Sequence, residues 1–254
     1  MPTVDVEGAQ LAYRVDGHGP DLVLVHAGIA DMRMWDPLVA LLVGRYTITR
    51  YDMRGYGQTT YAAGEFKPAD DLAALVSALE IDRCTLVGAS FGGHVALEFA
   101  ATHPDVVERL VVIDPLWEWE WSDDMESFFA SEDAALEAGN IDEAVRLNVE
   151  YWVGSADAGV KELVADMQER AFRLQLAAET EPVEIDPPVL SRIGDIAMPV
   201  TVAHGERDVQ DFVAIAHTLA EQLPSATLHC IARVAHLPAL ERPEAVADLI
   251  ATGR

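Results

Sequence analysis

The sequence predicts an α/β fold, in which helices cover both faces of a mostly parallel sheet. Short runs rich in Val, Ile and Leu alternate along the chain with longer segments of helical periodicity. The short runs are continuously apolar, as expected for strands that are buried on both faces of a parallel sheet. The chain has 254 residues, of which 50% are hydrophobic, so it is long enough to bury one large core.

The expected strands and helices follow one another in a regular order. Residues 4–6 and 9–15 are expected to form an antiparallel pair of strands. Further strands are expected at residues 21–26, 46–51, 84–88, 110–113, 200–204 and 227–231, which makes a sheet of about eight strands. Helices are expected at residues 69–79, 91–101, 211–223 and 243–251. Pro68 and Pro243 stand where the start of a helix tolerates proline.

One block of the sequence breaks this alternation. Residues 115–197 show helical periodicity and no convincing strand, with helices expected at 131–138, 141–152 and 160–178. The block holds four of the five tryptophans, namely Trp117, Trp119, Trp121 and Trp152. These indole rings either line an apolar pocket or pack the block against the rest of the protein.

Ser90 stands where nucleophilic chemistry needs a serine. It follows the apolar run of residues 86–89 and directly precedes a helical segment, so the chain turns sharply from strand to helix. Gly88 and Gly92 flank it in the Gly-x-Ser-x-Gly spacing of such a turn. Backbone N–H groups and the dipole at a helix N-terminus favour negative charge that develops on a reacting oxygen. The pattern predicts that Ser90 is a nucleophile.

A serine nucleophile needs a base, and the base needs an orienting carboxylate. Asp208 follows the strand expected at residues 200–204, and His236 follows the strand expected at residues 227–231. Ligands of open α/β sheets bind at the carboxyl ends of the strands, so Ser90, Asp208 and His236 are expected to meet there. Asp114 also ends an expected strand and is the alternative orienting acid.

Taken together, these segments resemble the α/β-hydrolase family over nearly the whole chain. His26-Ala27-Gly28 with Trp35 is similar to the oxyanion loop of the family. Residues 52–57 are similar to its Asp-x-Arg-Gly-x-Gly turn, and the segment from His236 to Pro243 matches its closing His-x-x-x-x-Glu-x-Pro pattern. Ala27 stands where the family usually has glycine, and Gln58 where a small serine is common.

The resemblance implies an α/β-hydrolase fold of two parts. Residues 1–114 and 198–254 would form the core, and residues 115–197 would be inserted as a helical cap, or lid, over the site. The backbone N–H groups of Phe91 and Gly28 would form the oxyanion hole.

The same resemblance implies a serine hydrolase that cleaves a carboxylic ester or lactone. Ser90 would attack the carbonyl carbon, His236 would act as general base and acid, and Asp208 would orient the imidazole. A C–C bond hydrolase or a cofactor-free perhydrolase would use the same three residues and stays open as an alternative. An alternative of another class is a protein that binds a small ligand with slow or no turnover.

The composition limits the partners of the chain. Its 17 basic and 43 acidic residues give a formal charge of −26, which disfavours nucleic acids and anionic membranes because phosphate contacts need clusters of Lys and Arg. We see no signal-peptide pattern and no apolar run near the roughly 18 residues that span a bilayer. A cytoplasmic protein with Cys84 and Cys230 as free, buried thiols is therefore expected.

No cofactor and no metal are expected. The histidines lack metal-ligand spacing, and neither a phosphate-binding nor a dinucleotide-binding glycine loop occurs. The expected partner is a small-molecule ester, lactone or related carbonyl compound, and no oligomeric state is predicted.

Overall fold

The computed structural model describes residues 1–178, 180–183 and 188–252. Its strands are β1 (Thr3–Val6), β2 (Ala9–Gly17), β3 (Asp21–Val25), β4 (Thr47–Tyr51), β5 (Thr60–Tyr61), β6 (Gly64–Phe66), β7 (Cys84–Ala89), β8 (Val107–Ile113), β9 (Thr180–Pro182), β10 (Val200–Gly205) and β11 (Ala226–Ile231). Its α-helices are α1 (Asp36–Leu42), α2 (Pro68–Ala78), α3 (Phe91–Thr102), α4 (Asp123–Glu137), α5 (Ile141–Val153), α6 (Ala158–Ala177), α7 (Gln210–Gln222), α8 (Pro238–Glu241) and α9 (Pro243–Thr252). Two 3₁₀ helices, η1 (Met32–Trp35) and η2 (Val189–Asp195), complete it.

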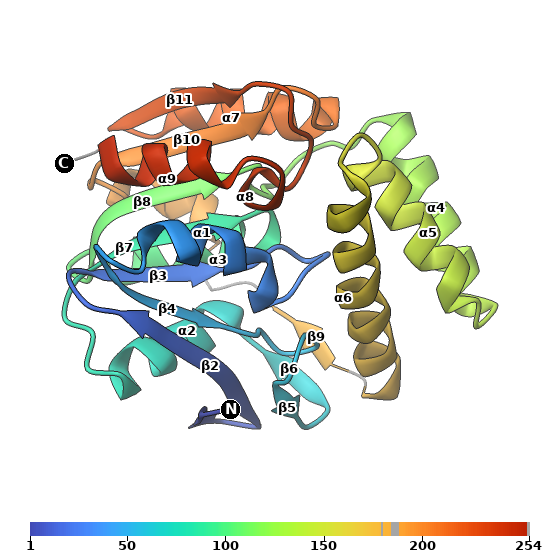
Figure 1. Cartoon of the computed structure of the whole chain (residues 1–254), viewed down its shortest axis with the longest axis horizontal. Helices are drawn as coiled ribbons and strands as arrows, with labels where there is room; N and C mark the ends of the chain where they lie inside the picture. Colours follow the sequence, from blue (N-terminus) through green and yellow to red (C-terminus); the bar gives the residue numbers. More distant parts are fainter. Residues whose placement is uncertain (179, 184–187, 253–254) are drawn as a thin grey trace.

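The central sheet is mostly parallel, which confirms the α/β class (Figure 1). It has nine strands, eight of them in the order β1-β2-β4-β3-β7-β8-β10-β11, with β5 paired to β2. Strand β2 runs antiparallel to β1 and β4. All further neighbours from β4 to β11 pair in parallel, so the carboxyl ends of these strands share one edge of the sheet.

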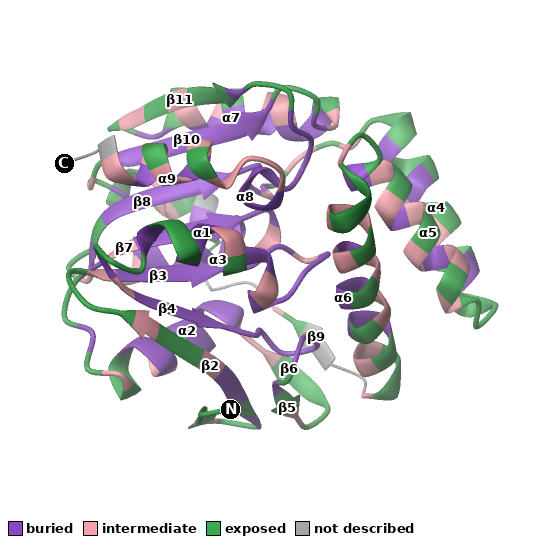
Figure 2. Ribbon diagram, viewed as in Figure 1, coloured by how far each residue is buried: buried purple, intermediate pink, exposed green. Residues whose placement is uncertain are grey.

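Helices cover both faces of the sheet. Along β3, Leu22 and Leu24 pack in one hydrophobic cluster, together with residues of α1 and α9. Val23 and Val25 alternate with them and pack in a second cluster, together with residues of α2 and α3. Figure 2 shows the strands in the middle of the molecule as its most deeply buried part. Burial on both faces explains why the strands are continuously apolar in sequence.

Helices α4, α5 and α6 lie beyond the edge of the sheet where the parallel strands end, and α6 lies nearest to the sheet (Figure 1). They are inserted between β8 and β10. Met167 of α6 reaches the body, where its sulfur accepts a hydrogen bond from the Asp31 N–H. The carboxyl ends of the parallel strands therefore face a layer of helices.

The structure corrects the expectation that residues 115–197 contain no strand, because β9 lies there and pairs in parallel with β6. A strand of three residues has too little periodicity to be read from the sequence, and its hydrogen bonds come from a distant segment. Helix α4 starts earlier than expected, at Asp123, because the Ser122 side chain caps it by accepting a hydrogen bond from the Met125 N–H. Helix α1 was not expected.

The two cysteines differ in their environment. Cys84 is buried in β7, whereas Cys230 is exposed in β11, so the expectation of two buried thiols is wrong for Cys230. Strand β11 is the last strand of the sheet, and an edge strand is covered less completely than a central one. Among the described residues, no helix is both long and apolar enough to span a membrane.

Gly92 is the point at which α3 approaches the end of β3. A Cβ at this position would lie 2.3 Å from the His26 carbonyl oxygen and 2.4 Å from that of Val25. We predict that Gly92→Ala lowers the free energy of unfolding by about 3 kcal/mol or leaves the protein insoluble, because two backbone segments must separate. The matched control is Gly44→Ala, whose added Cβ meets no atom within 4 Å. Urea denaturation measures both, and equal stabilities would contradict the prediction.

Candidate active site

Ser90 occupies a strained turn between β7 and α3. Its φ of 51° and ψ of −120° lie in a region that residues other than glycine rarely adopt. The Ser90 N–H donates to the Ile113 carbonyl at 2.9 Å, and the Ser90 carbonyl accepts from the Leu116 N–H at 3.0 Å. Gly88 makes the turn possible, since a Cβ there would lie 2.2 Å from the Gly92 carbonyl oxygen. The turn places the side chain at the start of a helix.

The loop that carries His236 lies directly against the end of β10. Gly205 allows this approach, because a Cβ there would lie 2.1 Å from the Ala235 carbonyl oxygen. On the other side of the loop, the Glu241 carboxylate accepts hydrogen bonds from the Ala235 N–H at 3.0 Å and the Leu237 N–H at 3.4 Å. Glu241 therefore holds the backbone on both sides of His236.

The structure brings together Ser90, Asp208 and His236, which the sequence analysis selected. His236 Nε2 lies 2.9 Å from Ser90 Oγ, and His236 Nδ1 lies 2.9 Å from Asp208 Oδ2. His236 is 1% exposed, Asp208 5% and Ser90 9%. Each side chain follows a different parallel strand, β7, β10 or β11. The result is one buried chain of hydrogen bonds from a hydroxyl through an imidazole to a carboxylate.

Asp114, the alternative acid, lies close by but makes a different hydrogen bond. Its Oδ1 accepts from the Gly205 N–H at 2.9 Å, and its carboxyl group also faces that of Asp208. Oxygens of Asp114 and Asp208 and a ring nitrogen of His236 lie within 4.8 Å of one another. Of these two carboxyl groups, the one that is hydrogen-bonded to His236 is therefore that of Asp208.

The two buried carboxyl groups differ in pKa. Burial raises the pKa of Asp114 well above its ordinary value, and repulsion by Asp208 raises it further. Burial also acts to raise the pKa of Asp208, but the adjacent His236, followed by hydrogen bonds from the Asp114 carboxyl and the Val209 N–H, outweighs burial and leaves that pKa lowered. We therefore take Asp208 as the ionised member of the pair and Asp114 as the neutral one.

Aromatic rings enclose His236. The Trp152 ring of α5 lies 4.4 Å from the imidazole, and the Phe212 ring of α7 lies 4.6 Å from it, both measured between centroids. The Trp152 carbonyl also accepts a hydrogen bond from the His236 N–H at 3.3 Å. Trp152 thus links α5 directly to the histidine. The sequence marks Trp152 as one of the four tryptophans of residues 115–197, but it carries no signal that marks Phe212.

His26 shapes the loop that follows β3. Its Nε2 accepts a hydrogen bond from the Met53 N–H at 3.0 Å, so the ring proton lies on Nδ1, which donates to the Ala27 carbonyl at 2.8 Å. Burial lowers the pKa of His26, which keeps the ring neutral. Asp52 adds a second connection, since its carboxylate accepts from the N–H groups of Met32 at 2.9 Å and Gln58 at 2.7 Å. The two turns after β3 and β4 are therefore joined.

Gly28 and Phe91, the expected oxyanion-hole residues, are neighbours in space. A Cβ at Gly28 would lie 3.4 Å from Phe91 Cβ. Phe91 is the first residue of α3, where the N–H has no acceptor within the helix. The N–H of Ala27 is already directed at Met34 Sδ, at 3.3 Å. The residue that follows Ala27, Gly28, lies beside the serine turn.

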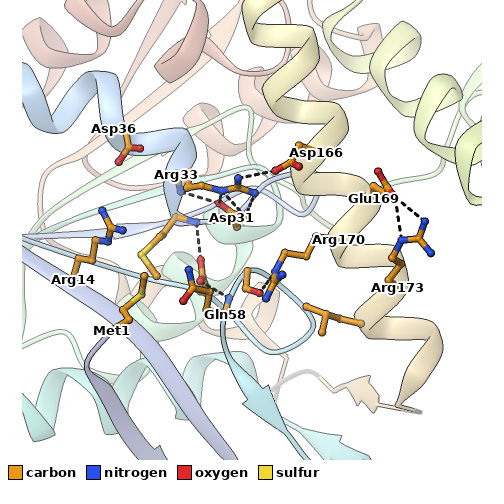
Figure 3. A pocket seen from close by; sticks show the side chains of 14 residues that line it. Met1, Arg14, Asp31, Arg33, Asp36, Gln58, Asp166, Glu169, Arg170 and Arg173 are labelled. Carbon is orange, nitrogen blue, oxygen red and sulfur yellow. Dashed lines mark hydrogen bonds and ion pairs between the residues drawn. The ribbon is translucent and has the colours of Figure 1, made fainter.

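An open cleft of about 640 Å³ separates α6 from the loops after β3 and β4. Figure 3 shows Arg33 between Asp31 and Asp166, at 2.8 Å and 2.7 Å. Arg170 of α6 donates to the Gly57 carbonyl. The Arg33 and Asp166 side chains are 38% and 67% exposed, so their ion pair contributes little to stability, whereas Asp31 is buried. The Arg33–Asp166 and Arg170–Gly57 contacts join α6 to the loops that follow β3 and β4.

The described residues contain one group of possible metal ligands, which consists of Asp114, Asp208 and His236. Both ring nitrogens of His236 are already hydrogen-bonded, to Ser90 and Asp208. A metal ion would have to replace one of these bonds, so the geometry fits a proton-transferring histidine better than a ligand.

Comparisons with known proteins identify the family and the fold. The sequence model of the alpha/beta hydrolase family matches residues 22–249 of this chain. An uncharacterized protein of Mycobacterium tuberculosis is 37% identical over 112 residues, which are 42% of this chain and 33% of that protein. The chain thus matches about a third of the length of this curated relative. The 2-(acetamidomethylene)succinate hydrolase of Mesorhizobium japonicum is 28% identical over 223 residues, 80% of this chain and 76% of that protein.

A solved structure extends the likeness to the whole fold. The enol-lactonase from Burkholderia xenovorans LB400 superposes with a TM-score of 0.81 over 98% of both chains, at 23% sequence identity. At this identity the superposition is a likeness of fold. Because the family model covers residues 22–249 and the fold agrees, the chain belongs to the alpha/beta hydrolase family.

Proposed function

We propose that this protein is a serine hydrolase that cleaves a carboxylic ester or a lactone through an acyl-enzyme. The observation that supports the proposal is the continuous chain of hydrogen bonds from Ser90 through His236 to Asp208. A serine hydroxyl is a weak nucleophile by itself, and a neighbouring base that is oriented by a carboxylate activates it.

Each of the three side chains has one role in the proposed reaction. His236 takes the Ser90 proton as Oγ attacks the carbonyl carbon, and then gives that proton to the leaving oxygen. Asp208 accepts the Nδ1–H bond and stabilises the imidazolium. Water then attacks the acyl-enzyme while His236 again acts as base. The Trp152 and Phe212 rings limit the access of other water to the imidazole.

The proposed oxyanion hole consists of the backbone N–H groups of Phe91 and Gly28. The support is their proximity, together with the hydrogen bonds of His26 and Met34 that hold the Ala27 peptide. Such donors stabilise the negative oxygen of the tetrahedral intermediate, and loss of one typically lowers kcat by about 10² to 10³.

Residues 115–197 are proposed to be the cap over a core of residues 1–114 and 198–254. Trp152 supports this role, because it comes from α5 and contacts His236. The two named relatives act on a succinate derivative and an enol-lactone, as their names state. They support a small carbonyl compound as the substrate of this chain.

The first prediction concerns the nucleophile. Ser90→Ala is expected to lower kcat for p-nitrophenyl esters by about 10⁴ to 10⁶, because the attacking oxygen is lost. The measurement is a series of acyl lengths with purified protein, in which the best length reports the size of the acyl site. Ser77→Ala, on the exposed face of α2, is the matched control. Full activity of pure Ser90→Ala would refute the assignment, and tight binding of the esters without turnover would favour a binding protein.

The second prediction separates the two acids. Asp208→Asn is expected to lower kcat by about 10⁴, because the Asn side chain no longer stabilises the imidazolium or selects the correct tautomer. Asp114→Asn is expected to lower kcat much less, because it replaces one neutral group by another. The measurement is kcat of both variants with the same ester. A larger loss of kcat in Asp114→Asn than in Asp208→Asn would make Asp114 the acid that orients His236.

The third prediction tests the neutral state of Asp114. Below about pH 4 the carboxyl is protonated in both the folded and the unfolded chain. As the pH rises, the unfolded chain releases this proton while the folded protein retains it, so the raised pKa makes the wild type lose stability. Asn does not titrate, so the stability of Asp114→Asn relative to the wild type should increase from about pH 4 to about pH 8. Urea denaturation across this range measures it, and a constant difference would contradict a neutral Asp114.

A further inference from the structure

Asp114 is a fully buried residue to which the proposed mechanism gives no role. It directly follows β8, which lies next to β10 in the sheet. Its φ of 45° lies in the left-handed region, which Asp and Asn adopt more readily than most residues that carry a side chain. Such a backbone conformation persists where the surrounding structure holds it, and it is frequent at functional sites. The contacts of Asp114 therefore show what the conformation serves.

Asp114 contacts the turn that carries Asp208 at both of its ends. The Asp114 N–H donates to the Ala203 carbonyl at 2.8 Å, and Asp114 Oδ1 accepts from the Gly205 N–H at 2.9 Å. The turn closes where the Asp208 N–H donates to the Gly205 carbonyl at 3.3 Å. The carboxyl group of Asp114 is also hydrogen-bonded with that of Asp208. One side chain thus binds the backbone at the start of the turn and the carboxylate at its end.

A hydrogen bond between two carboxyl groups needs one proton, and their other partners decide which group keeps it. Asp208 has two further donors: the Val209 N–H lies 2.8 Å from its Oδ1, and His236 Nδ1 lies 3.0 Å and 2.9 Å from its two oxygens. For Asp114 the described residues supply the Gly205 N–H as donor. Donors stabilise the charged form of a carboxyl group. The charge therefore stays on Asp208, and Asp114 keeps the proton and is the donor.

Glu241 of α8 is a third carboxyl group that acts on this pair. Its oxygens accept from the Ala235 and Leu237 N–H groups, on either side of His236. Burial is the largest cause of the raised pKa of Asp114, and the negative charges of Asp208 and Glu241 raise that pKa further. The charged groups around Asp114 therefore favour its protonated form, in agreement with the hydrogen-bond partners.

We propose that Asp114 is a positioning residue, which donates a hydrogen bond from its protonated carboxyl group to the Asp208 carboxylate and so holds that carboxylate toward His236. The chain of hydrogen bonds then has four members, Ser90, His236, Asp208 and Asp114. The added bond draws negative charge of Asp208 away from the imidazole, so it also limits how strongly Asp208 stabilises the imidazolium. The role in catalysis rests on the proposed function, whereas the hydrogen bond itself does not.

The pH profile of kcat/KM for one p-nitrophenyl ester tests this role on the full-length protein, because its acid limb reports protonation of the essential base. In Asp114→Leu, Asp208 loses the hydrogen bond and stabilises the imidazolium more strongly. The acid limb should therefore move to higher pH by about one unit, and the less well oriented Asp208 should lower kcat about tenfold. In Asp114→Asn, the amide N–H replaces the donor and the amide oxygen still accepts from Gly205, so the limb should stay at the wild-type pH.

Val200→Ala is the matched control, because Val200 is buried at the opposite end of β10 from Gly205. It should lower the Tm without moving the acid limb, which separates a loss of stability from the loss of the hydrogen bond. An acid limb at the wild-type pH in folded Asp114→Leu would overturn the role of Asp114. A limb that moves to lower pH in Asp114→Asn would also overturn it, since that variant would then have removed a negative charge rather than a neutral donor.

Infrared spectroscopy tests the hydrogen bond without any reference to activity, and it needs only the Asp114→Asn variant. The difference spectrum between the wild type and Asp114→Asn near neutral pH should contain the C=O stretch of a protonated, hydrogen-bonded carboxyl group. Absence of this band, or the higher frequency of a carboxyl group without a hydrogen bond, would overturn the proposal. The band without Ser90-dependent cleavage of any ester would refute the proposed function and leave the hydrogen bond in place. Ser90-dependent cleavage without the band would refute the role of Asp114 and leave the function in place.

Discussion

The close approach of α3 to the ends of β3 and β7 is the constraint on which the rest of the site depends. The helix begins directly after a strained serine, and two glycines remove the side chains that would separate the backbones. This contact directs Ser90 Oγ toward His236 and places the first residue of α3, whose N–H has no acceptor within the helix, beside Gly28. Loss of the contact would displace the hydroxyl and the N–H together, because both belong to one turn.

A second constraint acts on the histidine. His236 lies in a loop, and loops are usually more mobile than the elements that they connect. Here Gly205 lets the loop touch β10, Glu241 holds the backbone on both sides of the histidine, and Trp152 packs on the imidazole. The imidazole thus keeps hydrogen bonds to both Ser90 and Asp208, although none of the three lies within a strand or a long helix.

Burial gives two similar carboxyl groups different states. Asp208 has a hydrogen-bonded imidazole beside it, whereas Asp114 has a backbone N–H and a second carboxyl group. Two negative charges at this distance in a dry site would repel each other strongly, so one proton stays with Asp114. A neutral Asp114 leaves the negative charge on the oxygen that faces His236. Burial likewise lowers the pKa of His94, to about 4.

The sequence alone determined the α/β class and the order of Ser90, Asp208 and His236, because strand periodicity and turn glycines are local signals. The family motifs also marked His26, Asp52 and Glu241, whose hydrogen bonds hold the loops of the site. Only the tertiary structure decided that Asp208 rather than Asp114 faces His236, since both follow strands and differ only in packing. It also decided that β9 pairs with β6, and that Trp152 packs on His236 while Trp117, Trp119 and Trp121 line a pocket beside α3. These outcomes depend on contacts between segments far apart in the chain, which periodicity does not encode.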